Sequence, residues 1–429
     1  MHFLHASGSD FWYKNKKILL KGVGLGSWLN LEHFMFGLPG TDTEIRSIIQ
    51  NRFGAESAQL FWNTFYAAAV NEADIAFVKQ CGLNSIRIPV NHALFYDAEF
   101  TQSTAIREID RIVALCKKYE LWAIIDLHTA PECQNPDWHS DNNTGKDGFW
   151  YNPEAIDSFV DLWHNIARYY ANNTTIGGYD VINEPCFFTE EGTRGMMSFY
   201  QKCTRAIREV DQKHIIFYEG NTYSRDFTMF TDNLDENCAY TFHLYPFLQL
   251  PDKLHSTDKK ELLQQSLYND VSLEHLQKNL KKPLWCGETG HPLHLPDSFD
   301  IHAEYLSLLE NMNIGWAVWP LKDAGAMGML NVKQNSSWKH LCNTLSENWV
   351  FWDIFNQDSI LSVENENNSD PYSFYTRMAK LTTQAGKTVE QNIEKITFDE
   401  LLTAVQDFSF DTCEYNKALL KSMHCNNYK

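Results

Sequence analysis

Several features that mark other classes of protein are missing from this chain of 429 residues. No apolar run is long enough to span a membrane, and the opening segment Met1–Leu20 lacks the basic start and apolar stretch of a secretory signal. Basic residues are scarce, since 36 Lys and Arg stand against 55 Asp and Glu, for a formal net charge of −19. Such a charge disfavours nucleic acid and anionic membrane surfaces. We therefore expect neither a nucleic-acid nor a membrane partner.

The ten cysteines form no close-spaced framework, and the chain has no convincing linker, internal repeat or low-complexity tract. Cys81 and Cys116 fall on apolar helix faces, where a cysteine serves as a small core residue. With the start of the chain, this pattern predicts a reducing, cytoplasmic location. The polar segment Asn365–Asp370 is expected to be a loop. Nothing in the sequence indicates an oligomeric state.

Short apolar runs recur along the chain, mostly with helical patterns between them. The eight runs are Gly22–Trp28, Asn84–Pro89, Trp122–Leu127, Tyr179–Ile182, Ile215–Tyr218, Tyr240–Phe242, Pro283–Cys286 and Gly315–Trp319. Between them, Ala105–Tyr119 and Glu154–Ala171 carry apolar residues on one helical face. Nearly continuous apolar strands alternating with amphipathic helices indicate a parallel sheet covered by helices, and eight such units indicate a closed (β/α)8 barrel. An open, doubly wound sheet is the alternative.

Two further helical segments, Tyr372–Ala385 and Phe398–Gln406, are predicted after the last apolar run. They are expected to pack on the barrel. We therefore predict an α/β fold with one TIM-barrel domain over residues 1–385 and a helical C-terminal extension over residues 386–429.

Two glutamates lie where predicted strands open into loops. Glu184 stands in an Asn-Glu-Pro sequence after Tyr179–Ile182, and Glu288 stands in a Gly-Glu-Thr-Gly sequence after Pro283–Cys286. In a (β/α)8 barrel the carboxyl ends of the strands form the active site. Two carboxylates there are the minimum equipment for cleaving a glycosidic bond with retention.

Polar and aromatic side chains also occupy the ends of the other predicted strands. They include Trp28, Glu32, Arg87, Asp126, His128, Asn183, Glu219, His243, Tyr245, Trp319 and Asp323. This set describes a deep polar pocket with aromatic walls. Such a pocket suits a sugar, because hydroxyl groups need donors and acceptors while the C–H face of the ring stacks on indole.

The motifs around these residues resemble glycoside hydrolase family 5, a family of retaining (β/α)8 enzymes. The segment Lys21–Glu32 is similar to the opening of the family's exo-β-1,3-glucanase-like members, as are Asp126–His128 and the later pair Gln134-Asn135. The family's recurrent active-site set falls in order on Arg87, His128, Asn183, Glu184, His243, Tyr245, Glu288 and Trp319. The matching motifs span roughly residues 20 to 325.

This resemblance implies that Glu288 is the nucleophile and Glu184 the acid/base, with Arg87, His243 and Tyr245 in support. Arg87 is expected to hold the pKa of Glu288 down, and Glu184 is expected to begin protonated, with a raised pKa. The expected substrate-binding residues are Glu32, His128, Gln134, Asn135, Asn183 and Trp319.

Other interpretations of the same residues are weaker. Gly22–Gly26 has the spacing G-x-G-x-G, which differs from a nucleotide fingerprint and is interpreted as a tight loop. His128, Cys133 and His139 lack a close-spaced pair of metal ligands, so we expect no metal and no cofactor.

Glu219 and Asp323 could replace Glu288 as nucleophile, but are interpreted as supporting acids. A carbohydrate-binding barrel without catalysis is the alternative from another class, and the complete set of eight residues argues against it.

The substrate is the open question. Gly24 stands where the glucanase-like relatives usually carry Asn, and the loop Glu132–Asp141 differs from theirs. The long segments Glu32–Glu72 and Glu132–Asn152 are expected to wall off one end of the barrel mouth. We predict an exo-acting retaining β-glycosidase for short β-linked oligosaccharides, with β-mannosidase favoured over β-glucosidase. The alternatives are an exo-β-1,3-glucanase and an endo-β-1,4-glucanase or mannanase.

Overall fold

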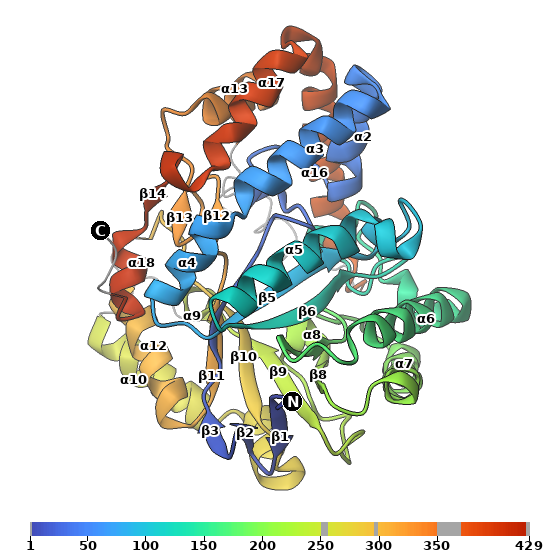
Figure 1. Cartoon of the computed structure of the whole chain (residues 1–429), viewed down its shortest axis with the longest axis vertical. Coiled ribbons are helices and arrows are strands. Elements are labelled where there is room, and N and C mark those ends of the chain that lie inside the picture. The colour runs from blue at the N-terminus through green and yellow to red at the C-terminus, as the bar shows by residue number, and fades with distance from the viewer. Residues whose placement is uncertain (1, 250–255, 296–298, 350–369, 426–429) are drawn as a thin grey trace.

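A closed barrel of eight parallel strands forms the centre of the computed structural model, which describes residues 2–249, 256–295, 299–349 and 370–425 (Figure 1). In chain order the strands are β4 (Lys21–Gly24), β5 (Ser85–Asn91), β6 (Trp122–Thr129), β7 (Ile176–Asp180), β8 (Ile215–Glu219), β9 (Cys238–His243), β10 (Leu284–Thr289) and β11 (Gly315–Val318). The last strand pairs with the first and closes the barrel. The predicted (β/α)8 barrel is confirmed, each of the eight apolar runs overlaps one strand, and the open sheet is excluded.

Helices surround the barrel (Figure 1). Those that follow successive strands are α4 (Glu72–Gln80), α5 (Thr104–Lys118), α6 (Pro153–Tyr170), α7 (Glu190–Val210), α10 (Ser256–Tyr268) and α12 (Phe299–Asn311). Capping defines their starts: the Ser103 hydroxyl accepts from the third residue of α5, and Asn152 caps α6 ahead of a proline. α5 and α6 agree with the two predicted helices. None of the helices in the described ranges combines the length and apolar character needed to cross a bilayer.

A small antiparallel sheet, which the sequence analysis does not predict, covers one end of the barrel (Figure 1). Its strands are β1 (His5–Ser7), β2 (Asp10–Tyr13) and β3 (Lys16–Ile18). Phe11 of β2 is buried in a cluster with Phe217 and Trp285, which lie near the amino-terminal halves of barrel strands. This end of the barrel is therefore filled with apolar side chains.

The segment after β4 and the C-terminal part of the chain form a second helical layer at one end of the molecule (Figure 1). Its helices are α1 (His33–Phe36), α2 (Asp42–Phe53), α3 (Ala55–Ala69), α13 (Ser337–Ser346), α16 (Ser373–Asn392) and α17 (Phe398–Ala404). Aromatic rings join the two parts: Phe36 lies 4.9 Å from Trp338, and Phe65 lies 5.2 Å from Phe408, centroid to centroid. A shared core therefore holds the C-terminal helices against the insertion that follows the first barrel strand.

The two predicted C-terminal helices correspond to α16 and α17. α16 continues to Asn392, so the predicted boundary between residues 1–385 and 386–429 falls inside an unbroken helix. Its buried residues, among them Met378 and Val389, lie on both sides of that boundary. The expected loop Asn365–Asp370 lies almost wholly outside the described residues.

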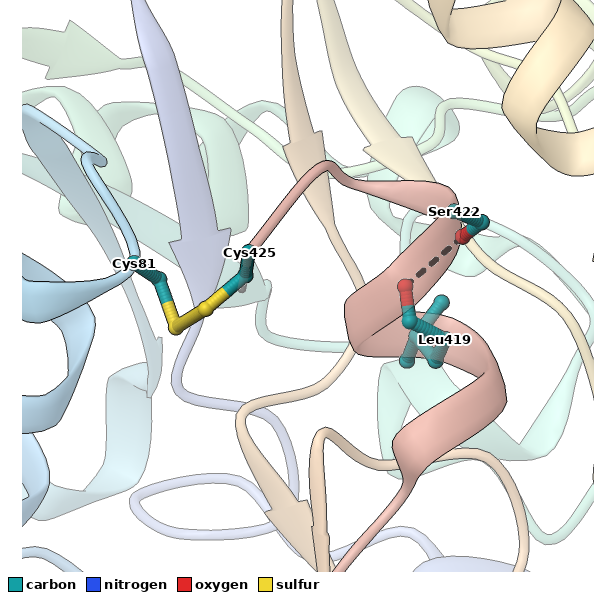
Figure 2. Close-up of a disulfide and its surroundings, with 4 residues drawn as sticks. All are labelled: Cys81, Leu419, Ser422 and Cys425. Carbon is teal, nitrogen blue, oxygen red and sulfur yellow. Dashed lines mark hydrogen bonds between the residues drawn. A yellow bond between two sulfur atoms is a disulfide. The ribbon is translucent and has the colours of Figure 1, made fainter. Parts of the chain in front are cut away.

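The C-terminal end of the chain is tied to the barrel layer (Figure 2). Cys81, at the end of α4, forms a disulfide with Cys425, which follows α18 (Lys417–Ser422). The Cα atoms are 4.7 Å apart across a sequence separation of 344 residues. The prediction that Cys81 is a free core residue is corrected, whereas Cys116 is a buried free thiol. Disulfides persist in oxidising compartments, and the expected cytoplasmic location stays a prediction.

We expect the double substitution Cys81→Ser with Cys425→Ser to lower the free energy of unfolding by roughly 2–4 kcal/mol, because the bond restricts a long loop in the unfolded chain. Urea unfolding of wild type and variant measures the difference. Dithiothreitol should lower the stability of the wild type to that of the variant and leave the variant unchanged. Cys413→Ser, which removes a half-buried free thiol, is the control. Equal stabilities without reductant would contradict the bond.

Candidate active site

A pocket of about 380 Å³ opens at the carboxyl ends of the barrel strands. Of the predicted site residues, those that line it are Glu32, His128, Glu184, His243, Tyr245, Glu288 and Trp319. Residues from the loops after β4 and β6, including Phe34 and Trp138, add aromatic walls. The pocket is polar at its base and aromatic at its sides, as expected for a sugar site.

The two predicted catalytic carboxylates face each other across this pocket. One oxygen of Glu184, one oxygen of Glu288 and a ring nitrogen of His243 all lie within 4.8 Å of one another. Glu184 follows β7 with a left-handed backbone, at a φ of 47°. Its amide donates to Glu219 Oε2 at 2.6 Å, which holds this strained turn in place. The barrel thus brings together two groups that are 104 residues apart in the chain.

Arg87 of β5 lies fully buried beneath the carboxylates. Its guanidinium donates to Glu288, to Asp180 Oδ2 at 2.9 Å and to Asn183 Oδ1 at 2.8 Å. Asp126 and Glu219 approach the same group at 3.1 and 3.3 Å. Burial lowers the pKa of Arg87, but these carboxylates raise it well above its ordinary value, so the cation is permanent. The expected contact between Arg87 and Glu288 is present.

Tyr245 and His243 complete the support of the two carboxylates. The Tyr245 hydroxyl donates to Glu288 Oε2 at 2.8 Å, and burial raises the pKa of Tyr245, so the group keeps its proton. His243 Nδ1 lies 2.7 Å from Glu184 Oε1. Burial lowers the pKa of His243, but the charges of Glu219, Glu288 and Glu184 raise it to about 10. His243 is therefore an imidazolium at neutral pH.

The protonation of Glu184 differs from the expectation. Burial raises the pKa of Glu184, but hydrogen bonds from His139 and His243 together lower it below the ordinary value. The expectation of a raised pKa is thus corrected: in this structure the pKa of Glu184 is lowered and the group is a carboxylate. From the sequence, His139 is weighed only as a metal ligand. Its place in the loop after β6, the strand that carries His128, is a signal, but the spacing alone does not show which way the side chain points.

Trp319 and His128 form a flat wall of the pocket. Their rings stack with centroids 5.5 Å apart and an interplanar angle of 8°. A Cβ atom on Gly24 would lie 2.4 Å from the indole ring of Trp319, and one on Gly26 would lie 2.7 Å from it. These glycines let Trp319 pack directly on the backbone at the end of β4. The interpretation of Gly22–Gly26 as a structural loop thereby gains a physical reason.

Glu32 and His128 offer hydrogen bonds to a sugar. His128 Nδ1 lies 2.7 Å from Asp126 Oδ2, and its Nε2 lies 3.8 Å from Glu32 Oε1. Burial raises the pKa of Glu32 to about 8, with smaller effects from neighbouring charges. At neutral pH Glu32 is therefore a carboxylic acid that can both donate and accept.

The three predicted binding residues with amide side chains differ in position. Asn183 accepts from Arg87, and its Nδ2 is buried without a hydrogen-bond partner among the described residues, so a donor is available for a sugar hydroxyl. Gln134 donates to the backbone oxygens of His128 and Asn183. Asn135 donates to the backbone oxygen of Glu184 at 2.9 Å. Like Asn183, neither Gln134 nor Asn135 is among the residues that line the pocket, and their contact with substrate stays a prediction.

The alternative nucleophiles are engaged elsewhere. Glu219 accepts from the Glu184 amide, the Ser224 hydroxyl and Arg87. Asp323 accepts from four consecutive backbone amides, residues 325 to 328. Neither lines the pocket. Both have the positions of supporting acids.

Known proteins show the same architecture. A family model described as cellulase (glycosyl hydrolase family 5) matches residues 41–325. A β-xylosidase of Phanerodontia chrysosporium is 31% identical over 361 residues, covering 80% of this chain and 75% of that protein. Endoglucanase C of Acetivibrio thermocellus is 25% identical over 308 residues, covering 62% of this chain and 87% of that protein. Thermotoga maritima Cel5A, solved with mannotriose, superposes with a TM-score of 0.53 at 17% identity, covering 73% and 92% of the two chains.

A (β/α)8 barrel with two carboxylates at its carboxyl-terminal mouth, together with these relatives, defines a glycoside hydrolase. The chain belongs to glycosyl hydrolase family 5. Enzymes of this family bind oligosaccharide substrates, as the mannotriose complex of Thermotoga maritima Cel5A illustrates.

Replacing Tyr245 with phenylalanine should lower kcat about 10- to 100-fold, because it removes a hydrogen bond to a charged carboxylate, worth roughly 1.5–3 kcal/mol. Steady-state kinetics on an aryl β-glycoside measures the effect. The matched control is Tyr119→Phe, which removes a hydroxyl that donates to Glu72 at 2.8 Å on the surface. An unchanged kcat for Tyr245→Phe would contradict its role in orienting Glu288.

Proposed function

We propose that the protein is an exo-acting, retaining β-glycosidase that hydrolyses short β-linked oligosaccharides. The observation that carries this proposal is the closest approach of the Glu184 and Glu288 oxygens, within 4.8 Å. Retaining enzymes hold their two carboxyl groups about 5–5.5 Å apart, and inverting enzymes about 6.5–9.5 Å apart. A separation this short is closer to the retaining range than to the inverting range, and so supports direct attack by the Glu288 carboxylate.

In this mechanism, Glu288 attacks the anomeric carbon while Arg87 and Tyr245 orient its carboxylate. Glu184 gives a proton to the leaving oxygen and then takes one from the water that cleaves the glycosyl-enzyme. The unpaired Nδ2 of Asn183 would donate to the sugar 2-hydroxyl, a contact that strengthens in the transition state. Side chains of the protein fill every role in this mechanism, so the proposal includes no metal and no cofactor, and we propose neither a nucleic-acid nor a membrane partner.

Exo action is supported by the walls of the pocket. The segment after β4 supplies Glu32 and Phe34, and the segment after β6 supplies Asp137, Trp138 and His139. Behind Tyr223, another lining residue, lies Tyr375 of α16, with ring centroids 6.3 Å apart. Long insertions that converge on one pocket favour a site that admits a chain end over a groove open at both ends.

The loop after β6 and one relative bear on the identity of the sugar. We favour a β-mannoside over a β-glucoside, because the loop Glu132–Asp141 departs from the pattern of the β-1,3-glucanases. The β-xylosidase relative adds a β-xyloside to the candidates. A panel of nitrophenyl β-glycosides of the three sugars, each tested at equal concentration, ranks them directly.

Glu288→Ala should abolish turnover, and azide should restore part of it while giving a glycosyl azide of opposite configuration. The reason is that azide fills the space of the missing nucleophile. Glu184→Ala is the matched variant: with a dinitrophenyl glycoside, azide should intercept the glycosyl-enzyme and give a product of retained configuration. Proton NMR of the two azides measures both outcomes. Full activity in Glu288→Ala would assign the nucleophile to another carboxylate.

Time-course chromatography on a hexasaccharide tests exo action. A pocket closed at one end should release monosaccharides stepwise from the non-reducing end, with a pentasaccharide as the first large product. Early accumulation of di- to tetrasaccharides would show an open cleft and favour the endo-acting alternative.

A further inference from the structure

Both carboxylate oxygens of Glu184 are bound by imidazoles. His243 Nδ1 lies 2.7 Å from Oε1, and His139 Nε2 lies 3.0 Å from Oε2. His243 comes from the end of β9, whereas His139 lies in a single 3-10 turn, η3 (Trp138–Ser140), in the loop after β6. An acid/base group needs one proton per catalytic cycle, and each of these imidazoles is close enough to supply it.

His243 is surrounded by acceptors. Its Nδ1 also faces Glu288 Oε2 at 3.7 Å, and its Nε2 faces Glu219 Oε1 at 3.5 Å. Each ring nitrogen therefore points at carboxylates, and loss of either proton would leave a bare lone pair against negative charge. His243 is held in the charged state and serves as a fixed cation.

His139 has partners for both of its states. In addition to Glu184 Oε2, its Nε2 lies 2.8 Å from the side-chain amide nitrogen of Asn135, which is a donor. A protonated Nε2 donates to Glu184, and a deprotonated Nε2 accepts from Asn135. Two hydrogen bonds hold the loop that carries His139 in place. Asn30 donates to the backbone oxygen of His139 at 3.0 Å, and Asn135 also donates to the backbone oxygen of Glu184.

We propose that His139 is a proton-holding partner of Glu184: before the reaction begins, the proton that Glu184 delivers to the leaving oxygen rests on His139 Nε2. This inference rests on the proposed retaining mechanism. His139 acts through Glu184 and is a positioning residue. Its second partner, Asn135, stabilises the imidazole once the proton has left.

The proton balance closes over one cycle. In the first step the Nε2–H bond of His139 breaks, Glu184 passes the proton to the leaving oxygen, and Glu288 forms its bond to the anomeric carbon as the glycosidic bond breaks. In the second step water gives its hydroxyl oxygen to the anomeric carbon, the bond to Glu288 breaks, and Glu184 takes the water proton. Glu184 then returns that proton to His139. No oxidant, metal or further reactant takes part.

The charges that face His139 come from several elements. Asp137 lies in its own loop, Glu184 follows β7, and Glu32 follows β4, while the rings of His128 and Tyr223 lie 6.3 and 6.0 Å away. The buried His33 after β4 is affected by the charge of His139. Burial lowers the pKa of His139, but the hydrogen bond to Glu184 and the three carboxylates raise it to about 9. His139 is therefore protonated below about pH 9 and loses its proton as the pH rises through that value.

The test uses two β-glycosides of the same sugar with different leaving groups. A dinitrophenolate leaves without a proton, whereas a second sugar needs one. In His139→Gln we expect kcat/KM for the disaccharide to fall about 100-fold or more and kcat/KM for the dinitrophenyl glycoside to stay within about threefold. The alkaline limb of the pH profile of kcat/KM for the disaccharide should also move to lower pH, by about one unit or more.

Asn135→Asp provides the opposite perturbation, because a carboxylate beside His139 favours the imidazolium. Its alkaline limb should move up in pH. His92→Gln is the matched control, since it removes a half-buried imidazole that contacts Thr129 outside the pocket. This variant should leave kcat/KM unchanged for both substrates. Thermal melts verify folding, and His139→Asn replaces the glutamine variant if that variant does not fold.

Equal losses on the two substrates, or no loss, would overturn the proton-holding role of His139 while the retaining mechanism stands. Inversion of configuration in the wild-type product would overturn both proposals, because the second step requires a glycosyl-enzyme. Retained product together with a selective loss on the disaccharide would support both.

Discussion

The contact between Arg87 and the carboxylates around it is the interaction on which the rest of the site depends. A guanidinium with no exposed surface lies at the centre of the barrel and touches acids from four strands or strand ends: Asp126, Asp180, Glu219 and Glu288. Neither the cation nor the acids could be buried alone at an acceptable cost in free energy. Five donors in a rigid fork allow one side chain to satisfy several acids at once. The barrel strands are therefore held in register by the same contacts that orient the nucleophile.

One buried cation does not balance all the acids, and this imbalance explains the protons in the site. With Glu184 included, five carboxyl groups surround Arg87 and the pocket base. The excess negative charge raises the pKa values of His243 and His139 to about 10 and about 9. Burial raises the pKa of Glu32 to about 8, although the charge of His139 lowers it, so Glu32 keeps its proton at neutral pH. Charge and burial together thus decide that His243, His139 and Glu32 carry protons at neutral pH. The chemistry of the pocket follows from these protonation states.

Much of the barrel was predictable because its strands carry a local signal. Apolar runs such as Trp122–Leu127 need only their own composition to be recognised, and a carboxylate at the end of such a run, as in Glu184, falls at the mouth by the geometry of the fold. The contact of His139 with Glu184 is not predictable in this way, because His139 lies in a loop, where the direction of a side chain depends on contacts with other strands. The same holds for Cys81, whose partner is 344 residues away. The sheet β1–β3 has strands of three or four residues, too short for a periodic pattern.

The shared aromatic core of α1, α3 and the C-terminal helices has a consequence for how the chain is made. Phe36 and Phe65 are synthesised early, but their partners Trp338 and Phe408 follow 302 and 343 residues later in the chain. At roughly 5–20 residues per second, the early helices wait for many seconds with an aromatic face uncovered. The same early segment supplies Glu32 and Phe34 to the pocket. The eight strands of the barrel can therefore pair before these two side chains are held in the wall of the pocket. Until the C-terminal helices are made, a nascent chain therefore carries an uncovered aromatic surface of the kind that chaperones bind.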